Sequence, residues 1–356
     1  MSALWSPVKI GKLELKHRLA LAPMTRSRAK ADGTPSDLAP EYYAQRASLG
    51  LLISEGTQPS DDGQGYTNTP GIYTDAQVAG WKKVTNAVHK AGGHIFIQLM
   101  HAGRVAHPDN TPHHRQPVAP SAISSDQPMF TPTGMQNTPT PRALTTAEVK
   151  QTVKDFAHAA KRAIEAGADG VEIHGANGYL VHQFMAPSSN NRTDEYGGSV
   201  ENRARFAIEV AKAVAAEIGP ERTGIRISPI NPGVKVVEGP EAAEQYEYLV
   251  TELNKLNLAY VHILHTGQDA LIASLRKIWK GPLLVNRPNA KVEDLDKDLK
   301  SGLADLVPVG KLGLANPDLV ARLKSKAPLN EANPATFFTP GSAGFIDYPT
   351  LAVAAE

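Results

Sequence analysis

The 356-residue sequence predicts an α/β fold, a single (β/α)8 TIM barrel with an N-terminal β-hairpin and long loops after its third and fourth strands. Three observations lead to this prediction. Short apolar runs alternate with longer stretches of helical period, the two kinds occur eight times each in strict order, and the short runs are rich in Val, Ile and Leu. Such runs are typical of parallel strands buried on both faces. Alternation of this kind builds right-handed βαβ units, and eight of them close into a barrel.

The first element is a hairpin at residues 8–15, where apolar residues alternate around Gly11-Lys12. We expect it to close the bottom of the barrel. The strand candidates are short and apolar, and they are residues 18–24, 51–57, 94–100, 170–176, 223–229, 260–266, 282–287 and 305–311. The helix candidates show the 3.6-residue apolar period, and they are residues 40–49, 75–91, 146–166, 202–218, 241–257, 270–279, 292–300 and 317–324.

An open, doubly wound sheet of similar length is the alternative fold. A glycine-rich fingerprint after the first strand would favour it, and Ala22-Pro23-Met24-Thr25 is not such a fingerprint. No linker divides the chain, so we expect residues 1–356 to form one domain. The segments 101–141 and 178–201 are longer than ordinary connections. On the C-terminal side of a barrel, long loops usually build the active site.

Composition narrows the classes of partner. Lys and Arg total 37 against 36 Asp and Glu, a net charge of +1, so nothing favours nucleic acid or a membrane surface. The chain contains no cysteine, which excludes disulfides and zinc–thiolate sites. The N-terminus lacks the pattern of a signal peptide, and no stretch approaches the ~20 apolar residues of a membrane span. We expect a soluble, cytoplasmic protein, either a monomer or a homodimer.

The C-terminal ends of barrel strands face the active site, and here they are polar but poor in carboxylates. Glu55 and Glu172 lie within strands, and no pair of acids is placed to hydrolyse a glycoside. No HExxH motif occurs, and we expect no metal site. What remains is a set of neutral hydrogen-bonding side chains with one cation and one or two imidazoles. Such a set suits binding a planar heterocycle and a carbonyl while a cofactor performs the redox chemistry.

Four longer motifs give these residues a specific context. They are Ala22-Pro23-Met24-Thr25-Arg26, Gln98-Leu99-Met100-His101-Ala102-Gly103-Arg104, His174-Gly175-Ala176-Asn177-Gly178-Tyr179 and Asn191-Arg192-Thr193-Asp194-Glu195-Tyr196-Gly197-Gly198-Ser199. In their order and spacing, over about residues 4–349, they resemble the old yellow enzyme family. The resemblance implies an FMN-dependent ene-reductase that takes electrons from NADPH or NADH. Its partners would be small electron-poor alkenes: unsaturated aldehydes, ketones, imides and nitroalkenes.

The resemblance also implies which residues bind FMN. Thr25 would donate its hydroxyl to flavin O4, Gln98 would pair with the pyrimidine edge, and Arg226 would place positive charge near N1 and C2=O. Backbone or strand-end contacts would come from residues at the ends of strands one, two, seven and eight: Pro23, Met24, Gly56, Asn286, Arg287, Gly310 and Lys311. For Thr25, Gln98 and Arg226 the alternative is a purely structural role.

His174 and Asn177 would donate to the substrate's carbonyl or nitro oxygen, and Tyr179 would protonate the α-carbon from the opposite face. A neutral phenol suits that step because its pKa near 10 keeps it protonated at neutral pH. Tyr66 and Tyr348 are candidate pocket walls, with core packing as the alternative for both, and Met100 is expected beside the flavin.

Three positions depart from the family pattern. Met100 stands where tryptophan is frequent, Lys311 where Gly-Arg is usual, and Asn286-Arg287-Pro288 replaces a glycine-rich end of strand seven. Pro288 has no N–H to donate, and lysine offers phosphate a point charge in place of a planar fork. We therefore expect Arg287 and Lys311 to bind the FMN phosphate together, with Arg287 as the stronger partner.

Two other functions remain open at this point. The first is another FMN barrel oxidoreductase, which would need different acid–base residues from the 174–179 segment. The second is a barrel that binds flavin or another ligand without turnover. The set of His174, Asn177 and Tyr179 favours the ene-reductase over both.

Overall fold

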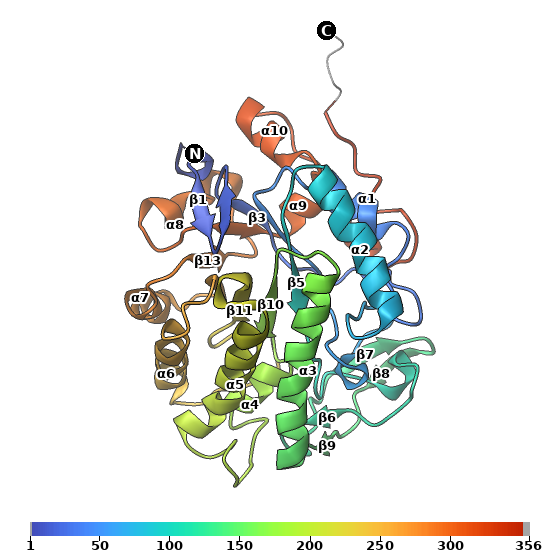
Figure 1. Ribbon diagram of the computed structural model, residues 1–356, viewed down its shortest axis with the longest axis vertical. Coiled ribbons are helices and arrows are strands. Elements are labelled where there is room, and N and C mark those ends of the chain that lie inside the picture. The colour runs from blue at the N-terminus through green and yellow to red at the C-terminus, as the bar shows by residue number, and fades with distance from the viewer. Residues whose placement is uncertain (1, 352–356) are drawn as a thin grey trace.

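The computed structural model describes residues 2–351 and contains the predicted barrel (Figure 1). Eight parallel strands form one sheet in the order β13-β12-β11-β10-β5-β4-β3-β14. Their bounds are β3 Leu19–Leu21, β4 Leu51–Ile53, β5 Ile95–Leu99, β10 Gly170–Gly175, β11 Thr223–Ile227, β12 Tyr260–Leu264, β13 Leu283–Asn286 and β14 Val307–Val309. A parallel bridge between Leu284 and Leu306 brings the two ends of this sheet together, so the barrel closes.

The helices lie outside the strands. They are α1 Ala39–Gln45, α2 Asp75–Lys90, α3 Thr146–Glu165, α4 Leu180–Met185, α5 Val200–Ile218, α6 Ala242–Asn254, α7 Asp269–Ile278, α8 Lys297–Lys300, α9 Lys311–Ala315 and α10 Leu319–Ser325. Helix α3 begins directly after Thr145, which forms a reciprocal capping box with Glu148. One prediction was wrong: residues 292–300 are not one helix but a 3-10 turn, Val292–Asp294, followed by the short α8.

The long loop after β5 contains its own secondary structure, which the sequence analysis did not predict. Strands β6 Val118–Ala119 and β9 Arg142–Ala143 pair, and β7 Pro128–Thr131 and β8 Gly134–Asn137 form a hairpin. The predicted N-terminal hairpin is confirmed as β1 Val8–Ile10 and β2 Leu13–Leu15. In Figure 1 the hairpin that contains β1 lies beside the N-terminus, and the β7–β8 hairpin lies on the opposite side of the barrel.

The interior of the barrel has an apolar layer and a polar layer. Ile10 and Leu15 of the N-terminal hairpin pack against inward residues of the strands, which are Ala20, Leu51, Ile53, Phe96, Tyr260, Leu284 and Leu306. The side chains that follow along the same strands are polar, and they are Gln98, Glu172, His174, Arg226, His262 and Asn286. Because side chains alternate along a strand, the residues between them face the helices and join the larger core. The hairpin therefore closes the apolar end, and the polar layer lies toward the opposite end.

Candidate active site

A cavity of about 360 Å³ opens above the polar layer, within the size range of small-molecule sites. Its walls come from the ends of most barrel strands and from one late loop. The lining residues are Ala22, Pro23, Met24, Thr25, Arg26, Gly56, Gln98, Met100, His174, Asn177, Tyr179, Arg226, Asn286, Pro288, Gly310, Lys311, Leu314, Phe337 and Phe338. The structure thus brings together all the predicted site residues except Tyr66, Arg287 and Tyr348.

The wall formed by β4 and β5 is tightly packed. A Cβ added to Gly56 would lie 2.5 Å from Met100 Sδ, so any larger residue here would force the methionine to shift. Met100 is itself buried and follows directly after β5. Met100 therefore lines the cavity, and its place beside the flavin stays a prediction.

The floor of the cavity presents an amide in one fixed orientation. Gln98 Nε2 donates to Glu172 Oε1 at 2.7 Å, and a carboxylate can only accept. The amide nitrogen must therefore face Glu172, which leaves the carbonyl oxygen and one N–H of Gln98 for a ligand. His262 Nδ1 lies 2.8 Å from the other oxygen of Glu172 and donates to it.

Arg226 supplies positive charge next to this amide. One Nη donates to Asn286 Oδ1 at 3.1 Å, while its buried Nε has no partner among the described residues. Asn286 donates in turn to the carbonyl of Pro308 at 2.9 Å, so it orients Arg226 from below. A buried guanidinium with an unused donor is suited to a ligand that carries negative charge or a polarised carbonyl.

His174 is a neutral hydrogen-bond donor. Burial, assisted by the positive charge of Arg226, lowers the pKa of His174 well below its usual value. Its Nδ1 accepts the N–H of Ala176 at 3.3 Å, so the single ring proton sits on Nε2. His174 therefore offers an Nε2–H to the cavity that it lines.

Asn177 presents its amide nitrogen to the same cavity. Its backbone has φ +58°, a left-handed conformation that asparagine tolerates, and its N–H donates to Ser228 Oγ at 2.8 Å. Asn231 Nδ2 donates to Asn177 Oδ1 at 3.3 Å. Because the oxygen is engaged, the Nδ2 group of Asn177 remains as a donor. Sequence reasoning missed Asn231 and Ser228, which lie in the loop after β11.

Tyr179 stands beside these two donors. Its ring lies 4.9 Å from the His174 ring in an edge arrangement, and its hydroxyl lies 3.0 Å from the hydroxyl of Tyr66. Burial raises the pKa of Tyr179 well above its usual value, and the nearby Tyr66 adds to this shift. Tyr66 lines a neighbouring cavity of about 230 Å³, so it contacts Tyr179 from behind and is not a wall of the main cavity.

These groups fit FMN. The pyrimidine edge of its ring carries an N–H between two carbonyls, which matches the acceptor and donor of Gln98 and the guanidinium of Arg226. Thr25 and the close backbone at Gly56 line the same cavity. No carboxylate lines it within the described residues, so nothing there would repel an electron-rich ring.

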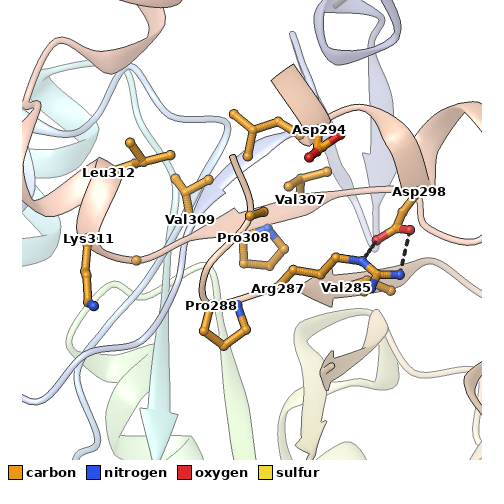
Figure 2. Close-up of a pocket in the computed structure, with 13 residues that line it drawn as sticks. Val285, Arg287, Pro288, Asp294, Asp298, Val307, Pro308, Val309, Lys311 and Leu312 are labelled. Atoms are coloured by element: carbon orange, nitrogen blue, oxygen red, sulfur yellow. Dashed lines mark hydrogen bonds and ion pairs between the residues drawn. The ribbon is translucent and has the colours of Figure 1, made fainter. Parts of the chain in front are cut away.

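The phosphate end differs from the prediction. A smaller pocket of about 50 Å³ adjoins the cavity between the ends of β13 and β14, sharing Pro288, Gly310 and Lys311 with it. Figure 2 shows Arg287 and Lys311 pointing away from one another. Arg287 donates from Nε and Nη2 to the two oxygens of Asp298 at 2.7 and 3.0 Å, so this edge of the guanidinium already binds a carboxylate. Of the two predicted phosphate ligands, only Lys311 borders the main cavity; it is exposed and has no carboxylate partner in the described chain.

Tyr348 requires a correction, and two aromatic residues were missed. Tyr348 packs at the edge of the core and its hydroxyl accepts the N–H of Asn333 at 3.0 Å, so it does not reach the cavity. Phe337 and Phe338 line it instead, and Phe338 is 65% exposed. The guanidinium of Arg26 lies 5.7 Å from the Phe337 ring, which ties this segment to the end of β3. The only sequence signal was an aromatic pair in a polar C-terminal segment.

Comparisons with known proteins agree with the geometry. The sequence model of the NADH:flavin oxidoreductase / NADH oxidase family matches residues 3–330. The chain is 45% identical to 12-oxophytodienoate reductase 1 of Oryza sativa, with 98% of this chain and 93% of that protein covered. It is 41% identical to a probable flavin mononucleotide-dependent alkene reductase of Leishmania infantum, covering 97% and 96%. Its structure superposes on an old yellow enzyme homologue from Zymomonas mobilis with a TM-score of 0.94, 39% identity and coverage of 98% and 99%.

Proposed function

The chain belongs to the NADH:flavin oxidoreductase / NADH oxidase family, and from this premise we infer that it is an FMN-dependent ene-reductase of the old yellow enzyme type. Its substrates are small alkenes conjugated to an electron-withdrawing group, and NAD(P)H is the electron donor. We propose further that FMN occupies the cavity of about 360 Å³ above the polar layer of the barrel.

Bound FMN would supply the redox chemistry, accepting a hydride from NAD(P)H and passing it to the β-carbon of the alkene. Gln98, Arg226 and Thr25 would bind its ring, with backbone contacts from Pro23, Met24 and Gly56. Asn286 would act through Arg226, because its amide oxygen accepts from the guanidinium. At the other end, Lys311 and Gly310 would bind the phosphate.

His174 and Asn177 would bind the oxygen of the activating group. Both side chains offer an N–H, from Nε2 and Nδ2 respectively, because their other polar atoms already accept hydrogen bonds. Two fixed donors stabilise the negative charge that forms on this oxygen as the β-carbon is reduced. Neither donor must move or change protonation state, so the stabilisation requires no reorganisation during the reaction.

Tyr179 would deliver the proton to the α-carbon. Its raised pKa keeps the phenol protonated throughout the neutral range. Its ring is held in place by His174 on one side and by the hydroxyl of Tyr66 on the other. A phenol gives its proton to a strongly basic enolate-like carbon, which makes it a suitable general acid for this step.

The observation that best supports this proposal is the grouping of the two neutral donors and the phenol at one wall of a cavity whose floor holds Arg226. The test is anaerobic reduction of the purified protein by NADPH, followed by reoxidation with enones, maleimides and nitroalkenes. We expect a yellow protein that bleaches with NADPH and recovers its colour with these alkenes. A protein that stays colourless after FMN is added would contradict the proposal.

The proposal extends to the domain organisation, the cellular location and the oligomeric state. We propose that residues 1–356 form one FMN-binding domain, and that the protein acts in the cytoplasm, where reduced nicotinamide coenzymes are generated. No helix within residues 2–351 is long and apolar enough to cross a membrane. We propose a monomer or homodimer, which light scattering of the flavin-loaded protein would distinguish.

A further inference from the structure

The polar layer of the barrel contains a carboxylate to which the chemistry above assigns no role. Glu172 is fully buried on β10, two residues before His174, and it does not line the cavity. Gln98 Nε2 donates to one of its oxygens and His262 Nδ1 to the other, at 2.7 and 2.8 Å. Glu172 therefore lies directly under the cavity floor, one hydrogen bond from its surface.

The register of the strands explains this grouping. Glu172 stands opposite Gln98 on β5, and His174 stands opposite Arg226 on β11, which is opposite His262 on β12. All five residues lie on the inner face of the barrel because inward positions recur every second residue. The polar layer is therefore one connected set, in which Glu172 contacts Gln98 on the neighbouring β5 and His262 on β12, two strands away on the other side.

Glu172 is ionised and influences Arg226. Although burial opposes it, the pKa of Glu172 is lowered by His262, Arg226 and Gln98 together. Burial lowers the pKa of the Arg226 guanidinium, and the charge that most strongly counteracts this is that of Glu172. The ring of His262 has a lowered pKa because it is buried, so it stays neutral and acts as a donor only. Glu172 is thus the anion that compensates the cation in the cavity floor.

We propose that Glu172 is a positioning residue for the flavin: it fixes the Gln98 amide with its oxygen toward the ring, and its charge offsets that of Arg226, which sets the flavin potential. This inference rests on the proposed function, because it requires FMN in the cavity. A cation beside the pyrimidine half of the ring favours the reduced, more negative flavin. An anion under that cation weakens the preference, so Glu172 keeps the bound flavin more strongly reducing.

The decisive variant is Glu172→Gln, which removes the charge with little change in shape. Its midpoint potential should rise, corresponding to about a tenfold increase in the affinity for reduced relative to oxidised FMN, or about 30 mV for a two-electron couple. The variant should also bind oxidised FMN more weakly, because a neutral amide no longer dictates which end of Gln98 faces the ring. Both quantities are measured on bound flavin without any alkene.

The chain offers a matched control in a second buried Glu–His pair. Glu238, in the loop after β11, lies 3.0 Å from His182 of α4 and accepts from Tyr246 of α6 at 3.0 Å, and it does not line the cavity. Glu238→Gln removes the same kind of charge and should leave the potential unchanged. If Glu172→Gln fails to fold, His262→Phe removes the N–H donor that holds the pKa of Glu172 down, so a larger fraction of Glu172 is protonated and carries no charge. His262→Phe should therefore also raise the midpoint potential of the flavin, by less than Glu172→Gln does.

An unchanged potential in Glu172→Gln, or an equal shift in Glu238→Gln, would overturn the inference. If Glu172→Gln does not fold, an unchanged potential in His262→Phe would overturn it equally. These results differ from a failure of the proposed function, in which the unaltered protein binds no FMN and no potential can be measured.

Discussion

The hydroxyl groups of Tyr66 and Tyr179 are 3.0 Å apart, and burial raises the pKa of both phenols. Two protonated phenols that share a hydrogen bond fix each other's orientation. Tyr179 lines both the main cavity and the neighbouring one, whereas Tyr66 lines only the neighbouring one. The pair therefore forms part of the wall between the two cavities, with the proposed acid on the side of the substrate.

Tyr179→Phe should slow enone reduction by roughly 10²- to 10⁴-fold, the usual contribution of a general acid, and leave flavin reduction by NADPH almost unchanged. Of the two half-reactions, only enone reduction, which reoxidises the flavin, needs a proton at carbon. Stopped-flow measurement of the two half-reactions checks this, with Tyr66→Phe as the milder control because it removes one hydrogen bond and no acid. Equal slowing of both half-reactions would mean that Tyr179 is a packing residue.

The double variant His174→Ala with Asn177→Ala should keep its flavin and lose enone binding. Each donor to developing charge is worth on the order of 3 kcal/mol, or 10²-fold or more in rate. Asn231→Ala is a graded control: it frees the Asn177 amide to rotate and should cost about 1 kcal/mol, roughly fivefold. Reoxidation of the double variant by cyclohexenone at the parent rate would remove both residues from the site.

The sequence was sufficient for the barrel because its pattern repeats. Every strand of the barrel was located, since buried parallel strands are continuous apolar runs, and the strand ends then identified most of the cavity lining. The failures at the site share one cause: each depends on a contact between separate elements of the fold. Phe337 and Phe338 reach the cavity from beyond the last strand, and the orientation of Arg287 is set by Asp298 in α8. A local sequence pattern does not predict such tertiary contacts.

Met100→Trp should narrow the range of substrates. Met100 is buried against Gly56 at the cavity wall, and a flexible thioether adapts to irregular ligands better than an indole. We expect bulky enones to react much more slowly in the variant and cyclohexenone to be little affected. Steady-state rates and product enantiomers for a graded enone series measure this. An unchanged range and an unchanged enantiomer would show that Met100 does not contact the substrate.

Two buried groups predict opposite pH dependences of stability. Burial lowers the pKa of His101 to about 4 and raises that of Glu55 to about 7, from 6.5 and 4.5. Between pH 6.5 and 4 the unfolded chain binds a proton at His101 that the folded protein does not, so the free energy of unfolding falls as pH falls. Between pH 7 and 4.5 the folded protein binds the extra proton at Glu55, so the free energy of unfolding rises.

His101→Asn should therefore resist acid better than the parent, and Glu55→Gln should resist it worse. Between pH 7.5 and 5.0 the free energy of unfolding of each variant should change relative to that of the parent by about 2 kcal/mol, with opposite signs for the two variants. Urea unfolding of the FMN-saturated proteins at the two pH values measures this. Parallel pH profiles for the parent and both variants would show that neither group titrates as its burial requires.

The phosphate end of the site supplies the last prediction, and here the structure changes the expectation drawn from the sequence. The guanidinium of Arg287 is bound in a bidentate manner by Asp298 and lies 3.5 Å from Asp269. Its charge is thus already balanced, and releasing it would leave the largely buried Asp298 without a partner. Lys311 has no such partner within residues 2–351 and borders the cavity where Pro288 and Gly310 lie.

We therefore expect Lys311→Ala to weaken FMN binding about tenfold or more, the value of a charge-assisted hydrogen bond, and Arg287→Ala to change it by less than about twofold. Riboflavin has the same ring and no phosphate, so it separates this contact from any distortion of the ring site. Both variants should bind riboflavin like the parent. The apoproteins are titrated with the two flavins, and flavin fluorescence follows binding. This gives a dissociation constant of each variant for FMN and for riboflavin, which are compared with those of the parent. A larger loss of FMN affinity in Arg287→Ala than in Lys311→Ala would restore Arg287 as the main phosphate ligand. It would also mean that Asp298 releases the guanidinium when FMN binds.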